Sequence, residues 1–189
     1  MSEDVLAAIK AIKKLGVEVV IKDNICKIYG VGLRGYKYKK NLTINAHNSG
    51  TLGRLISGIL IDTTYPIKIV GDKSLSKRDF KRVAKPLSRF GASFQLKNNC
   101  NLPLVIKGSQ NLKPIKFFEN KGSAQCKSSV IFGGIKANGK TFIKAKKSRN
   151  HTELLFKYLK LPIRIRKNKN FDIIEIRKVR EIKPINYKI

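Results

Sequence analysis

Tryptophan is absent from this chain of 189 residues, and only 12 acidic residues stand against 41 lysines and arginines. The formal net charge of +29 would ordinarily suggest a nucleic-acid partner. However, the basic residues are spread through every segment and form no single arm or helix, and no RNP or zinc-finger signature is present. A basic nucleic-acid-binding module therefore remains only an alternative, and we expect no specific nucleic-acid partner.

Cysteine is scarce as well. Cys26, Cys100 and Cys126 are an odd number at wide spacing and form no Cys-x-x-Cys pair, which argues against a disulfide framework and a zinc site. No apolar run approaches the length of a membrane span, and the first residues lack the pattern of a signal peptide. We expect reduced thiols in a soluble cytoplasmic protein with no membrane partner.

No cluster of His, Cys, Asp and Glu has metal-ligand spacing, and no P-loop or Gly-x-Gly-x-x-Gly string occurs, so no metal and no cofactor is expected. Four short runs carry chemistry instead. They combine glycines, hydroxyls, one amide and guanidinium groups, which together can hold small molecules with several negative charges. The runs are 48–54, 71–78, 123–125 and 148–149.

A helical pattern occurs three times, at 4–16, 79–91 and 150–160, and recurs about every 70 to 75 residues. Each copy opens on Asp or Asn, which we expect to be the N-cap. Apolar residues then follow at helical spacing, such as Leu6, Ile9 and Ile12 in the first copy and Leu154, Leu155 and Tyr158 in the third. Gly16 and Gly91 are expected to end the first two helices in a left-handed conformation.

After each of these helices, alternating residues around an Asn or Asp turn predict a β-hairpin, with turns at Asp23-Asn24, Asn98-Asn99 and 168–170. A second helix is predicted near 50–61 and 125–137, each followed by a strand at 66–70 or 141–145. The alternation of helices and strands predicts an α/β (α+β) fold made of repeated βαβαββ units.

The four runs, together with Arg149-Asn150-His151-Thr152-Glu153, resemble in order and spacing the EPSP synthase (3-phosphoshikimate 1-carboxyvinyltransferase) family, over essentially the whole chain. The resemblance implies one lobe of an inside-out α/β barrel with pseudo-threefold symmetry, with helices buried and sheets outside. The single lobe would span 1–189, with units at approximately 1–45, 46–120 and 121–189. The first unit would lack its opening strand and first helix.

Family members also have an N-terminal substrate-binding segment and a second domain, normally covalently attached, that supplies acid/base carboxylates. Neither is found in this sequence, so the resemblance implies a chain that is inactive alone, with no catalytic residue of its own. The implied substrates are phosphoenolpyruvate and shikimate 3-phosphate, joined in the shikimate pathway of aromatic amino acid biosynthesis.

The resemblance also implies roles for individual residues. Phosphoenolpyruvate would be bound by Gly50, Arg78 and Gln125. Shikimate 3-phosphate would be bound by Ser123, Ala124, Gln125, Ser148 and Arg149. The loop around Gly50 would be supported by Asn48, Thr51 and Arg54.

Simpler interpretations exist for the same residues, because Ser-Gly-Thr and Ser-Ala-Gln both make ordinary helix starts. Asn150 stands where relatives have Asp, and we expect it to keep the cap. His151, next to this cap, is expected to be structural. A related enolpyruvyl transferase acting on UDP-N-acetylglucosamine is the second alternative, and it is less similar at 123–125 and 149–153.

Overall fold

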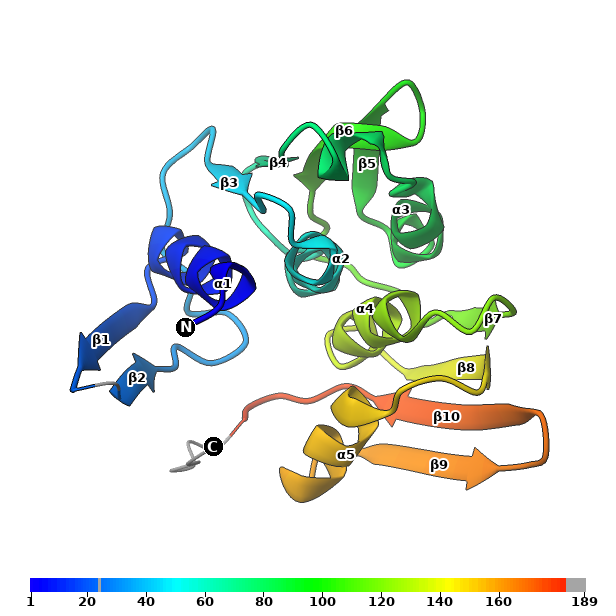
Figure 1. The fold of residues 1–189 in the computed structure, drawn as a ribbon. Coiled ribbons are helices and arrows are strands. Elements are labelled where there is room, and N and C mark those ends of the chain that lie inside the picture. Colours follow the sequence, from blue (N-terminus) through cyan, green and yellow to red (C-terminus); the bar gives the residue numbers. More distant parts are fainter. Residues whose placement is uncertain (24, 183–189) are drawn as a thin grey trace.

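Two four-stranded sheets lie on either side of a central pair of helices in the computed structural model, which describes residues 1–23 and 25–182 (Figure 1). The first of these sheets has the order β3-β4-β6-β5. Its strands are β3 (Thr43–Asn45), β4 (Ile67–Val70), β5 (Ser93–Lys97) and β6 (Asn101–Lys107). The second has the order β7-β8-β10-β9. Its strands are β7 (Lys116–Glu119), β8 (Lys140–Lys146), β9 (Ile163–Lys167) and β10 (Phe171–Arg177).

Both sheets have the same pairing: the first two strands in sequence run parallel, and the remaining neighbours run antiparallel. Two helices complete each unit. They are α2 (Gly50–Ile59) and α3 (Lys81–Ser88), with the short helix η1 (Leu75–Lys77) before α3, and α4 (Ala124–Gly134) and α5 (His151–Tyr158). The predicted βαβαββ repeat and the mixed α/β class are therefore confirmed.

The N-terminal unit contains α1 (Glu3–Lys14) and the hairpin of β1 (Glu18–Lys22) and β2 (Ile25–Tyr29). These are the last three elements of a βαβαββ unit. A complete unit would have an opening strand, a first helix and a middle strand before these elements, and none of the three occurs among the described residues. The middle strand was not among the elements expected to be missing. The strand pairing also places β3 in the second unit and β7 in the third, slightly ahead of the approximate divisions at 45 and 120.

Each sheet turns one face to the helices because its residues alternate between buried and exposed. In β10, for example, Asp172, Ile174 and Ile176 are buried, whereas Ile173 and Arg177 are exposed. Side chains from these inward faces and from α2, α3 and α4 form the two large apolar clusters of the core. The central helices α2 and α4 are thus interior and the sheets peripheral, whereas α1 and α5 have exposed faces.

The central helices α2 and α4 approach each other through small residues. A Cβ atom added to Gly58 would lie 2.2 Å from the carbonyl oxygen of Ser129, so no side chain fits there. Ser129 also donates hydrogen bonds from Oγ to the carbonyls of Arg54 and Gln125, at 2.7 and 2.8 Å. The separation of the two helices is therefore set by backbone contact.

The helix ends agree with the sequence only in part. Gly16 and Gly91 have φ of +83° and +117°, which confirms the left-handed ends. The predicted N-caps Asp4 and Asp79 are wrong, because Ser2 caps α1 and Phe80 holds the N-cap position of α3. Asp79 instead accepts a hydrogen bond from the Lys81 N–H at 2.8 Å.

Asn150 is the N-cap of α5, as predicted, although its side chain makes no capping bond. The hairpin turns were predicted well. Asn98 and Asn99 both have positive φ, 50° and 60°, as a tight turn between right-twisted strands requires. Asp23 has φ of 49°, and Asn24 lies outside the described residues.

The predicted apolar face of α5 is wrong. Leu154, Leu155 and Tyr158 are 55%, 39% and 61% exposed, whereas the buried residues of this helix are Glu153 and Phe156. The reason is a charge on the neighbouring helix: Glu153 faces inward because it pairs with Lys127 of α4. Helical spacing alone could not show this, since the partner is distant in sequence.

No helix in residues 1–23 and 25–182 has both the length and the apolar character needed to cross a bilayer. Within the same residues, no group of three or more His, Cys, Asp or Glu side chains could hold a metal ion.

Candidate anion-binding site

Two arginines flank the start of α2. Ser49 caps this helix by accepting a hydrogen bond from the Leu52 N–H, so the first turn begins at Gly50. A Cβ atom added to Gly50 would lie 2.8 Å from Nη1 of Arg54 and 3.3 Å from Nη1 of Arg78. Arg78 also donates to Oδ1 of Asn48 at 3.4 Å. The runs 48–54 and 71–78 are therefore brought together, with two guanidinium groups packed over the buried backbone of Gly50.

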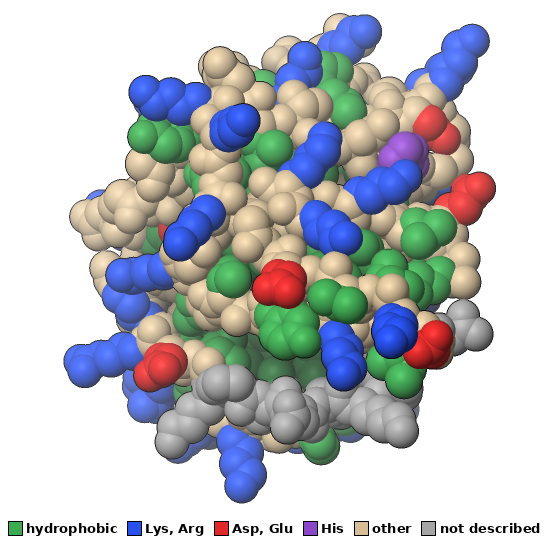
Figure 2. Space-filling model, turned by 90° about the vertical axis from the view of Figure 1, so that its left-hand side faces the viewer, with side chains coloured by type: hydrophobic (Ala, Val, Ile, Leu, Met, Phe, Trp, Pro, Cys, Tyr) green, Lys and Arg blue, Asp and Glu red, His purple; other side chains and the backbone are tan. Residues whose placement is uncertain are grey.

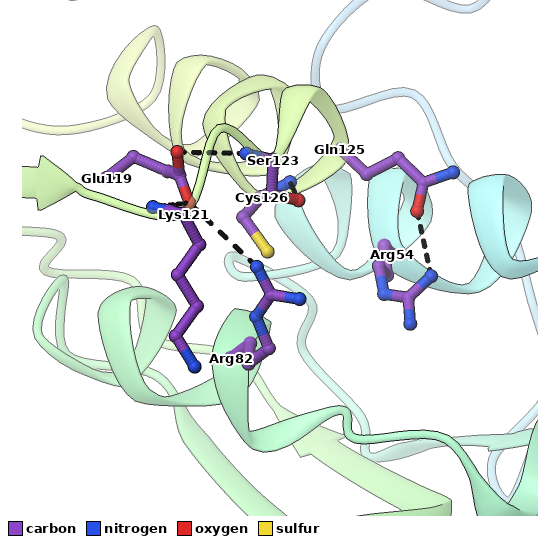
Figure 3. A network of polar contacts seen from close by, with 7 residues as sticks. All are labelled: Arg54, Arg82, Glu119, Lys121, Ser123, Gln125 and Cys126. Carbon is purple, nitrogen blue, oxygen red and sulfur yellow. Dashed lines mark hydrogen bonds and ion pairs between the residues drawn. The ribbon is translucent and has the colours of Figure 1, made fainter. Parts of the chain in front are cut away.

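Gln125 joins this pair of loops to α4. Its Oε1 accepts a hydrogen bond from Nη1 of Arg54 at 2.7 Å, and its Nε2 donates to Oγ1 of Thr51 at 2.8 Å. Both ends of the amide are fixed, so the side chain is held in one orientation between the two helices. Figure 3 shows Gln125 and Arg54 directed toward each other from α4 and α2.

The turn before α4 is organised by Glu119, which the sequence did not single out. The two oxygens of this buried carboxylate accept hydrogen bonds from the N–H groups of Lys121 and Ser123, at 3.2 and 2.9 Å (Figure 3). Arg82 lies 3.9 Å away. Ser123 is the N-cap and accepts from the Cys126 N–H. The carboxylate at the end of β7 thereby shapes the run that contains Ser123 and Ala124.

A cavity of about 540 Å³ opens beside this turn, between α3 and the end of β7. Its polar wall includes Arg82, Lys85 and Lys121, and Cys126 lies at its base. This cavity borders the turn that holds Ser123 and extends the positive surface away from Gly50.

Ser148 lies close to the same turn. A Cβ atom added to Gly122, whose φ is +69°, would be 3.5 Å from the carbonyl oxygen of Lys147. The Oγ of Ser148 is buried and has no hydrogen-bond partner among the described residues. A buried hydroxyl without a partner is costly, so this atom is suited to a ligand. Arg149 follows on the exposed side, and its side chain makes no hydrogen bond or ion pair with the other residues that the structure describes.

The position of α5 relative to α4 is fixed by two polar contacts. Nζ of Lys127 lies 2.6 Å from Oε1 of Glu153, and both side chains are almost completely buried. Between the neighbouring residues of these two, Oγ of Ser128 and Oγ1 of Thr152 are 2.8 Å apart. These contacts hold the Ser148-Arg149 turn near the start of α4, and no local sequence pattern predicts them.

The site is strongly positive. Burial lowers the pKa of Arg54 from its usual value. Cys126 opposes this effect, the nearby charges of Arg78 and Arg82 lower the pKa further, and Asp79 makes the smallest contribution, in the raising direction. Neither Arg54 nor Arg78 takes part in an ion pair within the part of the chain that the structure describes. Elsewhere basic side chains are scattered, as Figure 2 shows for one face, whereas here two guanidinium groups meet at one glycine.

The structure thus brings together most of the residues selected from the sequence. Asn48, Gly50, Thr51, Arg54, Arg78 and Gln125 form one connected group. Ser123 and Ala124 begin the helix that carries Gln125, and Ser148 lies at the adjoining turn. Arg149 is linked to the group only through its neighbours in the chain. The group contains anion-binding donors and no side chain that titrates near neutral pH.

A family model described as EPSP synthase (3-phosphoshikimate 1-carboxyvinyltransferase) matches residues 1–189. The 3-phosphoshikimate 1-carboxyvinyltransferase of Streptococcus mutans is 42% identical over 157 residues, which cover 82% of this chain and 36% of that protein. The protein of the same name from Ruthia magnifica is 44% identical over 169 residues, covering 88% of this chain and 38% of that protein.

The solved structure of EPSP synthase from Acinetobacter baumannii superposes with a TM-score of 0.86 at 32% identity, covering 96% of this chain and 41% of that one. The chain therefore spans well under half the length of these relatives. Because the family model matches residues 1–189 and the solved structure covers 96% of the chain, this chain belongs to the EPSP synthase family.

Proposed function

We propose that this chain forms one lobe of an enzyme that transfers the enolpyruvyl group of phosphoenolpyruvate to shikimate 3-phosphate. The observation that carries the proposal is the unpaired arginine pair at Gly50, joined through Gln125 to the start of α4. Both substrates carry phosphate and carboxylate groups, which planar guanidinium forks bind well. The names of the relatives favour this reaction over the UDP-N-acetylglucosamine and nucleic-acid alternatives.

In this proposal phosphoenolpyruvate lies against Gly50 and Arg78. The absence of a side chain at Gly50 leaves room for the guanidinium groups of Arg54 and Arg78 at the start of α2, where the helix dipole adds to the attraction for an anion. Arg78 is held toward this point by Asn48. Gln125 faces both substrates, with one amide N–H left over after its bonds to Arg54 and Thr51.

Shikimate 3-phosphate would occupy the adjoining turns. Ser123 and Ala124 present the first turn of α4 to its phosphate, and the partnerless hydroxyl of Ser148 can bond to the same ligand. Arg149 supplies positive charge from the exposed side. The family resemblance, which implies these contacts, also implies that no cofactor is used.

The reaction needs proton transfers: C3 of phosphoenolpyruvate is protonated, the 5-hydroxyl of shikimate 3-phosphate adds to C2, and phosphate leaves. The carboxylates around the described loops are already engaged. Asp72, Asp79 and Glu119 each accept hydrogen bonds from backbone N–H groups. We therefore assign this chain to substrate binding, with the acid and base groups supplied by another domain.

Replacing Arg149 by Ala is expected to weaken the binding of shikimate 3-phosphate by about 1.5–3 kcal/mol, because a hydrogen bond to a charged group is lost. Isothermal titration calorimetry on the chain measures this directly. Lys157→Ala is the matched control, since Lys157 is an exposed cation near the far end of α5, the helix that Arg149 precedes. Equal losses in the two variants would show that only the overall charge matters.

The chain alone is expected to release no phosphate from phosphoenolpyruvate when shikimate 3-phosphate is added, because its site holds binding groups without a free acid or base. A continuous phosphate assay with both substrates measures the rate, and omission of shikimate 3-phosphate gives the background. Phosphate release that depends on shikimate 3-phosphate would contradict the assignment of substrate binding to this chain and of acid/base catalysis to another domain.

A further inference from the structure

The outward face of the β7-β8-β10-β9 sheet interleaves aromatic rings with cations, a pattern that the linear sequence does not reveal. Strand register aligns the outward residues in rows across the sheet. One row consists of Phe118, Lys144, Ile173 and Arg166. The next row consists of Lys116, Phe142, Glu175 and Arg164.

The rings on this face are accessible. Phe118 is 50% exposed, and its ring centroid lies 5.5 Å from that of Phe171 on β10, with the two planes inclined by 55°. Nζ of Lys144 stands over both rings, 5.2 Å from the centroid of Phe118 and 4.8 Å from that of Phe171. A depression of about 520 Å³ next to Phe118 is lined by Phe142 and Ile173 as well. That volume is in the range of pockets that hold organic ligands.

The other four-stranded sheet provides an internal comparison, because it has the same topology. Its equivalent outward row is Thr43, Lys68, Val105 and Gln95. Lysines occur there too, but none of the outward positions on its described strands carries an aromatic ring. The aromatic platform is therefore a feature of the second sheet and does not follow from the fold.

The charged side chains of this face indicate which kind of partner it can bind. Glu175 is the one acidic side chain among the outward positions of these described strands, and it is bonded to Arg177 at 3.0 Å. The remaining cations of the face have no ion pair within the described residues. A second copy of this chain, itself carrying +29, would be repelled. A polyanion with flat apolar groups complements both the cations and the rings.

We propose that this face binds single-stranded nucleic acid without sequence specificity, in addition to and independently of the proposed enzymatic role. Bases would stack on Phe118 and Phe171, displacing the ammonium group of Lys144, and phosphates would contact the cations at the rim. Four-stranded sheets with exposed aromatics and basic edges bind single strands in this way, because every base has a stacking face. A duplex, whose bases are stacked internally, would gain only the charge interaction.

Fluorescence anisotropy with a labelled oligodeoxythymidylate tests the proposal at about 0.15 M salt, where weak long-range attraction is screened. Phe118→Leu keeps an apolar side chain and removes the ring, and it is expected to weaken binding at least about fivefold. Tyr29→Leu is the control, because Tyr29 is an equally exposed ring on β2. Circular dichroism melting verifies that each variant is folded.

A second pair of variants tests whether the affinity depends on where the cations lie or only on the total charge of the chain. Lys116→Ala/Lys146→Ala removes two cations from the proposed face, and Lys68→Ala/Lys107→Ala removes two from the other sheet. The first pair is expected to lose several-fold more affinity than the second. Equal losses, an unchanged Phe118→Leu variant, or duplex binding as tight as single-strand binding would overturn the proposal. So would a preference for anionic phospholipid vesicles that depends on Phe118.

Discussion

Lys127→Met is expected to lower the free energy of unfolding by about 3–5 kcal/mol, because it leaves the Glu153 carboxylate buried without its partner. The pair is 0% and 2% exposed, and the second oxygen of Glu153 has no hydrogen bond among the described residues. Water therefore cannot compensate for the lost ammonium group. Urea denaturation followed by circular dichroism gives the change.

The Glu175–Arg177 pair offers a matched control. Arg177→Met breaks a contact of similar type, 3.0 Å long, whose arginine side chain is 46% exposed. Exposed pairs contribute at most about 1 kcal/mol, so this variant should be nearly as stable as the parent. The double variant Lys127→Met/Glu153→Met should recover much of the loss, because no charge remains buried. If Lys127→Met and Arg177→Met cost the same, the interior pair is not desolvated as the structure indicates.

Gly58→Ala is expected to destabilise the chain by about 3 kcal/mol, at the upper end of ordinary overpacking. In an exposed helix the same change would stabilise, since alanine favours helix by about 1 kcal/mol over glycine. Here the new methyl group would lie 2.2 Å from the carbonyl oxygen of Ser129, so backbone has to move. A loss of stability would therefore show that the contact with Ser129 outweighs the higher helix propensity of alanine.

Gly30→Ala is the control for this prediction. Gly30 does not have a positive φ, and a Cβ atom there would meet nothing within 4 Å. Its replacement should change the unfolding free energy by less than about 0.5 kcal/mol. Thermal melts of both variants give the comparison. A Gly58→Ala variant as stable as Gly30→Ala would mean that α2 and α4 can separate without cost.

Local signals predicted most of the fold. The Asn98-Asn99 turn and the glycine at 91 were read correctly, because such backbone conformations depend on the residue itself. The buried face of α5 was predicted wrongly, because Glu153 turns inward to pair with Lys127 on another helix. The N-cap of α1 was missed for a similar reason. Ser2 and Asp4 both have side chains that can cap a helix, and the local sequence does not distinguish them.

The residues that lie together in the candidate site could be selected from the sequence, whereas the residues that hold them in place could not. Gly50, Arg78 and Gln125 were selected by resemblance, and the structure places them in one connected group with Arg54. Glu119 was missed because a single acidic residue after a strand has no distinguishing local pattern. Its role depends on two N–H groups that the folded loop turns toward it.

The β1-β2 hairpin implies that stability is distributed unevenly along the chain. Of its strand residues described in the structure only Val19 is buried, and Ile21, Ile25, Ile28 and Tyr29 are about half exposed. Detaching this hairpin from the rest of the chain uncovers little additional apolar surface, so the hairpin can unfold locally at a lower free energy than the two complete units. A melting temperature for this chain therefore reports the cooperative unfolding of those units, and the hairpin unfolds locally well below that temperature.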